Sequence, residues 1–138
     1  MAPRSEPVDV RADRAVQGTI TVIALGAFVF HLPWVVPVLA VLLAIGAVRG
    51  PAVNPFHRIF AALVAPHLSP PTATVPAPTV QAQDQLEVAL LVVATLCILI
   101  GLGVVGWFVT VVAGGTALAA ATTGVHLGVM VTERIRPK

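Results

Sequence analysis

Residues 88–132 read "VALLVVATLCILIGLGVVGWFVTVVAGGTALAAATTGVHLGVMVT" and contain no Asp, Glu, Lys or Arg. One helix of these 45 residues would be about 68 Å long, more than twice the ~30 Å thickness of a hydrocarbon core. Gly101, Gly103 and Gly106 interrupt the stretch, and glycine permits a tight turn. The stretch therefore predicts a transmembrane hairpin with helices at about 86–104 and 107–132.

A second uncharged stretch, residues 15–48, is also too long for one span. It is interrupted by "HLPW" and by Pro33 and Pro37, and proline disrupts a helix interior. We therefore expect a first hairpin with helices at about 13–31 and 33–49. The predicted fold class is all-α integral membrane, with four transmembrane helices arranged as two hairpins.

The composition agrees with a membrane protein of one domain. The 138 residues are 57% hydrophobic and 10% charged, whereas soluble domains average about 25% charged residues. The net charge of +2 and the lack of a basic stripe argue against nucleic acid as a partner. The single cysteine, Cys97, excludes an internal disulfide and a cysteine-based zinc site.

The placement of charge predicts the topology. All charged residues lie in the two tails or in the central segment and its flanks, and neither hairpin turn carries one. The positive-inside rule makes those regions cytoplasmic, and Trp34 and Trp107 in the turns suit the opposite interface. We expect a multi-pass protein of the bacterial inner (plasma) membrane, with both termini cytoplasmic. The predicted segments are an N-terminal tail (1–14), a first hairpin (15–49), a cytoplasmic connection (50–85), a second hairpin (86–132) and a C-terminal tail (133–138).

The cytoplasmic connection begins with an amphipathic pattern. Asn54 is a favourable N-cap and Pro55 a favourable first helical residue. One predicted face holds the apolar residues Phe56, Ile59, Phe60, Leu63 and Val64, and Arg58 lies on the other side. This helix is expected to lie on the membrane surface with Arg58 near anionic headgroups, or to pack its apolar face against the protein's own helix ends. A proline-rich, extended spacer is expected to follow, up to residue 85.

Few ionisable groups are expected inside the membrane. Cys97 is predicted to be a small apolar core residue, and His31 an interfacial residue at the outer turn. His126 is expected near the cytoplasmic interface. It either forms a hydrogen bond that fixes the packing, for example with Thr122 or Glu133, or joins His57 and His67 as a metal ligand.

Small residues recur along the last predicted helix and allow another helix to approach closely. The candidate helix-packing residues are Ala113, Ala117, Ala121, Gly124 and Gly128.

Three sequence segments carry a family resemblance: "VDVRADR" (8–14), "GAVRGPAVNPFHRIFAALVAPHLSPP" (46–71) and "AATTGVHLGVMV" (120–131). They resemble the actinobacterial integral-membrane family known as domain of unknown function 4395. The resemblance implies a four-helix membrane protein without an assigned activity, and a link to thioredoxin-like or sulfurtransferase proteins in some members. Where that family has a Cys-Leu-Gly-Cys run, this chain has His126, Leu127, Gly128 and Val129, so a thiol function does not carry over.

Three classes of function remain open. The first is a non-catalytic accessory or assembly subunit of a larger membrane complex, with membrane lipid and other membrane proteins as partners. The second is a redox, sulfur or metal-handling protein that uses the cytoplasmic histidines. The third is a small oligomeric transporter, which the scarcity of expected mid-membrane charges disfavours. No enzyme activity and no cofactor are predicted.

Overall fold

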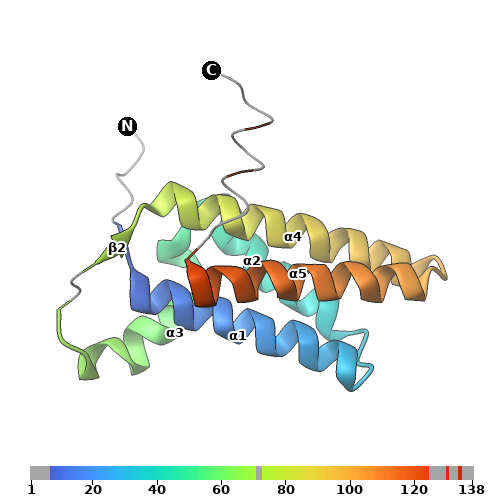
Figure 1. Cartoon of the computed structure of the whole chain (residues 1–138), viewed down its shortest axis with the longest axis horizontal. Coiled ribbons are helices and arrows are strands. Elements are labelled where there is room, and N and C mark those ends of the chain that lie inside the picture. The colour runs from blue at the N-terminus through green and yellow to red at the C-terminus, as the bar shows by residue number, and fades with distance from the viewer. Residues whose placement is uncertain (1–6, 71–72, 125–129, 131–133, 135–138) are drawn as a thin grey trace.

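The computed structural model describes residues 7–70, 73–124, 130 and 134. Four helices pack as a bundle, and a fifth, shorter helix lies beside one end of it (Figure 1). In chain order the elements are β1 (Val8–Asp9), α1 (Val10–Val29), α2 (Val35–Arg49), the 3-10 turn η1 (Pro51–Val53), α3 (Pro55–Leu63), the 3-10 turn η2 (Ala65–His67), β2 (Thr74–Val75), α4 (Ala77–Leu99) and α5 (Gly103–Thr123).

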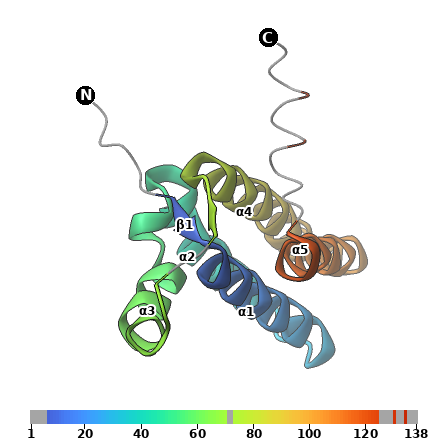
Figure 2. The ribbon, with the colours of Figure 1, turned by 60° about the vertical axis from the view of Figure 1, so that its left-hand side comes forward.

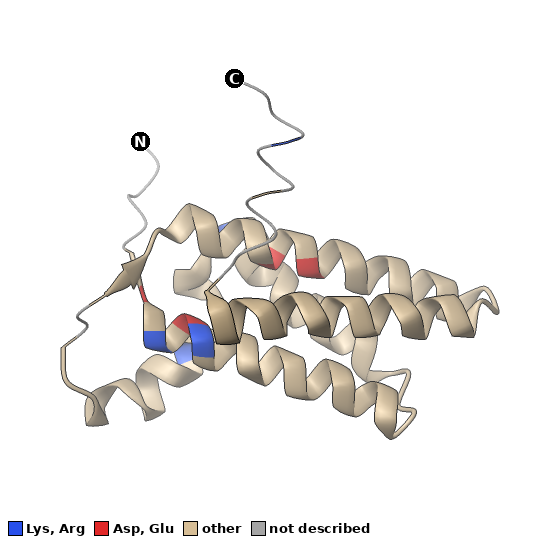
Figure 3. Ribbon diagram, viewed as in Figure 1, with Lys and Arg blue, Asp and Glu red and all other residues tan. Residues whose placement is uncertain are grey.

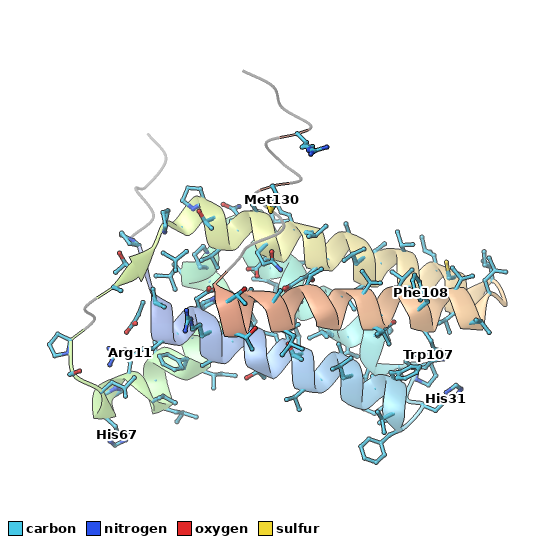
Figure 4. The ribbon with its side chains drawn as sticks, in the orientation of Figure 1. Arg11, His31, His67, Trp107, Phe108 and Met130 are labelled. Atoms are coloured by element: carbon cyan, nitrogen blue, oxygen red, sulfur yellow. The ribbon has the colours of Figure 1, made fainter. Side chains whose placement is uncertain are left out.

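The two expected hairpins are present, and their turns lie at the same end of the bundle (Figure 1). The first turn closes through His31, which has a left-handed φ of 56°, a conformation that His adopts more readily than most residues. Its ring lies against Trp107, with ring centroids 5.1 Å apart (Figure 4). The second turn uses Gly101 at φ 91°. The His31–Trp107 contact therefore joins the two hairpins at this end.

The helices do not pack in sequence order. α1 packs mainly on α5, α2 on α4 and α4 on α5, whereas α1 and α2 share few contacts. Small residues allow the close approach: a Cβ added at Gly106 of α5 would lie 2.6 Å from Ile98 Cγ1 and 2.8 Å from the carbonyl oxygen of Ala94 on α4. This packing of small residues is typical of helices in membranes.

The outer surface of the bundle is apolar. Large hydrophobic side chains such as Val22, Val41, Val104 and Phe108 are exposed along it, which a soluble protein of this size avoids. Three helices, α1, α4 and α5, are long and apolar enough to cross a membrane, and α2 is a shorter apolar helix. Fold and surface together indicate an all-α membrane protein.

The first structural difference from expectation is at the start of α4. The helix begins at Ala77, nine residues before the predicted position, so the expected extended spacer ends at Pro76. Pro78 is tolerated because it lies in the first helical turn. The added turns also satisfy the C-terminal end of α2, since the side-chain amides of Gln81 and Gln85 donate to the carbonyl oxygen of Ala47 at 3.0 and 3.1 Å.

α1 likewise begins earlier than expected, at Val10, because Asp9 caps it. The Asp9 side chain accepts a hydrogen bond from Arg11 N at 2.9 Å, and it forms an ion pair with the Arg11 guanidinium at 2.8 Å. Next to this cap, β1 pairs antiparallel with β2 (Figure 2), and Arg11 also donates to the carbonyl oxygen of Ser69 at 2.7 Å. The connection between the hairpins is thereby tied to the start of α1.

α5 ends earlier than the predicted helix. Its last residue is Thr123, and Gly124 follows as its C-cap with a left-handed φ of 76°. The single helix expected over 107–132 is therefore wrong, because a glycine in this conformation ends a helix. His126 and Gly128 lie outside the described residues.

Candidate functional site: a buried polar cluster

Seven polar side chains are buried together in the half of the molecule away from the turns, and we refer to them as the polar cluster. They come from α1, from α4 and from the start of α3. The polar cluster consists of Asp13, Gln17, Asn54, His57, Gln83, Asp84 and Glu87.

α1 contributes Asp13 and Gln17, which are four residues apart and therefore lie on the same helix face. Both side chains are essentially inaccessible to solvent. Asp13 is buried because α1 starts at Val10, which places Asp13 inside the first turn instead of in a solvated tail. One turn further, the Thr21 hydroxyl donates to the carbonyl oxygen of Gln17 at 2.9 Å. The polar side of α1 thus continues into the bundle.

α4 contributes Gln83, Asp84 and Glu87, all fully buried. The Gln83 side-chain amide donates to Glu87 Oε1 at 2.8 Å, an i to i+4 contact along the helix. Glu87 lies about 15 Å along the axis from the start of α4 and about 18 Å from its end at Leu99. A carboxyl group is therefore buried near the middle of a helix long enough to span a membrane.

Asn54 joins three elements. Its Oδ1 accepts a hydrogen bond from Phe56 N at 2.9 Å and caps α3, while its Nδ2 donates to Asp84 Oδ2 on α4 at 3.0 Å. The pair packs on Gly46 of α2, where an added Cβ would lie 2.6 Å from Asn54 Nδ2 and 2.9 Å from Asp84 Oδ2. Glycine at position 46 is thus a requirement of this contact.

His57 closes the polar cluster from the side of α3. Its imidazole is buried, and burial lowers its pKa below the ordinary value of 6.5, although the negative charge of Asp13 acts in the opposite direction. The ring is therefore neutral at pH 7. Its Nε2 atom is buried without a hydrogen-bond partner within the described part of the chain.

Within the part of the chain that the structure describes, the polar cluster holds carboxyl groups and no basic side chain of Lys or Arg. It contains three carboxyl groups, and the negative charges of Asp84 and Asp13 both act on Glu87. Among the described residues, no Lys or Arg is buried. An ionised carboxylate in a protein interior is very costly unless it is paired.

Several polar atoms of the polar cluster have no hydrogen-bond partner within the ranges that the structure covers. They are Glu87 Oε2, His57 Nε2 and both side-chain amide atoms of Gln17. Leaving a buried polar group unsatisfied costs about 1–3 kcal/mol. Among the described residues, the polar cluster therefore combines spare hydrogen-bonding capacity with several buried carboxyl groups.

The metal site expected from sequence is not assembled by the described histidines. His57 is buried in the polar cluster, whereas His67 in η2 is exposed (Figure 4). Within residues 7–70 and 73–124, no three His, Cys, Asp or Glu side chains are arranged to hold a metal ion. A site that includes His126 stays a prediction, because that residue is outside the described chain. Cys97 is a free thiol that is half-buried.

The other predicted residues have mixed positions. Ala113 and Ala117 are buried in the bundle, Ala121 is partly buried, and Gly124 is the C-cap of α5 instead of a helix-face residue. On α3, Phe56 and Phe60 are partly buried, while Arg58, Ile59 and Leu63 are exposed. The small-residue row thus packs partly inside this chain, and part of the amphipathic face remains uncovered.

Sequence analysis missed the polar cluster because it assigned Asp13, Asp84 and Glu87 to cytoplasmic flanks. Burial of these groups in the bundle was not predicted. A signal was present, since Asp13 and Gln17, like Gln83 and Glu87, are polar pairs at i, i+4 spacing. The pattern would have been recognised if the helices had been extended to Val10 and Ala77.

The fold and the polar cluster define a helical membrane protein with buried ionisable groups. The chain matches the family model described as Domain of unknown function (DUF4395) over residues 8–136. The protein belongs to this family, as the sequence resemblance implied. No curated protein and no solved structure matches the chain.

Proposed function

We propose that this protein is a small polytopic membrane protein that binds and releases a proton or a small cation at the polar cluster. The observation that carries the proposal is Glu87, fully buried near the middle of α4 and acted on by two further carboxyl groups. Ionisable residues buried within membrane-spanning helices mark ion pathways and proton relays in membrane proteins. The proposal assigns the protein to transport or ion handling and to no enzyme class.

The proposed topology has four spans, with both termini and the α3 segment on the cytoplasmic side of a bacterial inner membrane. It is supported by the distribution of charge, because the acidic and basic side chains gather away from the hairpin turns (Figure 3). Trp34 and Trp107 at the turn end suit the opposite interface. α2 has only 15 residues, about 22 Å, so this span requires local thinning of the bilayer or snorkelling of Arg49.

The direct test is ion flux in liposomes that contain the purified full-length protein. A potassium diffusion potential set by valinomycin drives protons, and an enclosed pH-sensitive dye reports their movement; sodium flux is measured in parallel. We expect flux above that of protein-free liposomes, its loss in Glu87→Gln, and partial retention in Glu87→Asp. Wild-type flux equal to that of protein-free liposomes for every ion would contradict transport.

Ion binding without flux is tested separately by infrared difference spectroscopy of the full-length protein at varied pH and sodium concentration. The carboxyl band of a protonated, buried Glu should titrate in the wild type and be absent in Glu87→Gln. A spectrum that is the same in both proteins would remove the polar cluster as the binding site. A titrating band without flux would support an ion-dependent structural role.

An accessory subunit of a membrane complex is the second candidate. Gly18 and Gly26 lie about two turns apart on α1, and a Cβ added at either would meet nothing within 4 Å. They are therefore not needed for packing inside this chain, and small residues permit close approach of a second helix. Mass spectrometry of proteins that co-purify from native membranes, compared with a Gly18→Leu variant, tests this role.

A further inference from the structure

α3 has one side on the protein and one side free. Asn54 fixes its first turn to α4 through Asp84, and His57 is buried against the polar cluster. Ile59 and Leu63, one turn apart, are 57% and 67% exposed, and the adjoining Val64 is 42% exposed. Packing inside the described chain therefore does not account for the apolar edge of this helix.

Positive charge lies beside this apolar edge. Arg58 is exposed and precedes Ile59 directly, and it forms no ion pair with another described residue, whereas Arg11 pairs with Asp9. Basic positions of α1 and α3 lie in the same region of the molecule (Figure 3), and α1 and α3 are in contact. An apolar edge flanked by an unneutralised cation is the pattern of an interfacial helix.

The place of α3 along the chain puts it at a membrane surface. α2 ends at Arg49, and only Gly50, η1 and Asn54 separate it from the first residue of α3. Val48, in the last turn of α2, is 77% exposed and belongs to the apolar outer surface of the bundle. The uncovered edge of α3 therefore starts close to the level at which this surface ends and headgroups begin.

We infer that α3 docks on anionic phospholipid, with Ile59 and Leu63 at the boundary of headgroups and acyl chains and Arg58 on a headgroup phosphate. The depth of such an insertion is about 5–10 Å. The inference is independent of ion binding at the polar cluster, because Ile59 and Leu63 lie about 200° and 240° around α3 from the buried His57. Lipid docking would also hold His57 against the polar cluster from outside.

Fluorescence of a single label in nanodiscs tests the docking. In the full-length protein with Cys97→Ser, an environment-sensitive dye is attached to Leu63→Cys or, as the matched control, to Ala61→Cys. Both positions are exposed, but they are about 200° apart around the helix. In discs that contain phosphatidylglycerol, the dye at 63 should be quenched by lipid carrying a shallow nitroxide, and the dye at 61 by a water-soluble quencher.

The charge dependence provides a second readout. Replacing phosphatidylglycerol by phosphatidylcholine, or Arg58 by Gln, should weaken the docking equilibrium about fivefold, as expected for roughly 1 kcal/mol per basic residue near an anionic surface. A dye at 63 that stays accessible to the water-soluble quencher in both lipids would overturn the inference. Protection that rises with protein concentration and shows no lipid quenching would overturn it as well, in favour of a second protein on this edge.

Discussion

Asn54 donates a hydrogen bond to Asp84 across 3.0 Å and thereby joins the start of α3 to the buried side of α4, thirty residues further along the chain. The same asparagine caps α3 through its Oδ1. One side chain therefore sets both where α3 begins and where it lies relative to the bundle. The Oδ2 atom of Asp84 thereby accepts a hydrogen bond inside the protein.

The Asn54–Asp84 contact should contribute measurably to stability. Asn54→Ala removes the cap and leaves Asp84 Oδ2 without this donor, and we expect a loss of about 1–3 kcal/mol in the free energy of unfolding. Asn54→Ser retains a capping oxygen but cannot reach Asp84 in the same way, so its loss should be smaller. Thermal unfolding in detergent measures both variants. Equal stability of Asn54→Ala and the wild type would refute the role of the contact.

Gly46 should tolerate no side chain. Gly46→Ala places a methyl group 2.6 Å from Asn54 Nδ2, and forcing the pair apart should cost about 1–3 kcal/mol. The matched control is Gly18→Ala, which meets nothing within 4 Å and should be neutral or stabilising by up to about 1 kcal/mol through helix propensity. The measurement is the melting temperature of each variant relative to the wild type. The same shift in both variants would show that steric crowding at position 46 does not affect stability.

His57 should make stability depend on pH below neutrality. Burial lowers its pKa from 6.5 in the folded protein, so the unfolded state binds the proton more readily. The stability that the neutral ring contributes is present above pH 6.5 and is lost as the pH falls toward the folded-state pKa. The melting temperature should therefore fall between pH 7.5 and 5.5, and His57→Gln should reduce this fall. The control is His67→Gln at the exposed histidine, which should behave as wild type, and an unchanged fall in His57→Gln would exclude His57 as its cause.

Glu87 should be more important for ion binding than for stability. Replacing a buried ionisable group by an uncharged group of similar volume often leaves the free energy of unfolding unchanged or raises it by about 1–4 kcal/mol. Glu87→Gln should therefore unfold at the same or a higher temperature than the wild type at pH 7.5, while ion dependence disappears. A marked destabilisation in this variant would instead indicate a structural carboxylate.

The membrane class and the two hairpins could be predicted because they follow from local sequence. Charged residues cannot remain unpaired against lipid, so uncharged stretches as long as 88–132 reveal spans directly. Gly101 and Pro33 mark turns through backbone preferences that act on single residues. The N-cap at Asn54 was predictable for the same reason, and the structure confirms it.

The polar cluster could not be predicted in this way, because it is formed by contacts between distant parts of the chain. Asp13 and Glu87 are hydrophilic and lie within three residues of another charged residue, which is also the pattern of a solvated helix end. The pairing of β1 with β2 and the contacts of Gln81 and Gln85 with the end of α2 accompany additional N-terminal residues in α1 and α4, so Asp13 and Glu87 lie within helices. Burial of these carboxyl groups is thus a consequence of packing.

The sequence by itself determined that the chain is an apolar, all-α membrane protein with two helical hairpins, because hydropathy and turn residues act over a few positions at a time. Only the tertiary structure decided that α1 packs on α5, that Gly46 leaves room for the Asn54–Asp84 pair, and that Glu87 is buried near the middle of α4. Burial of a residue depends on which helices pack together and on how far each is shifted along the axis of the bundle. Those relations are set by complementary surfaces far apart in the chain.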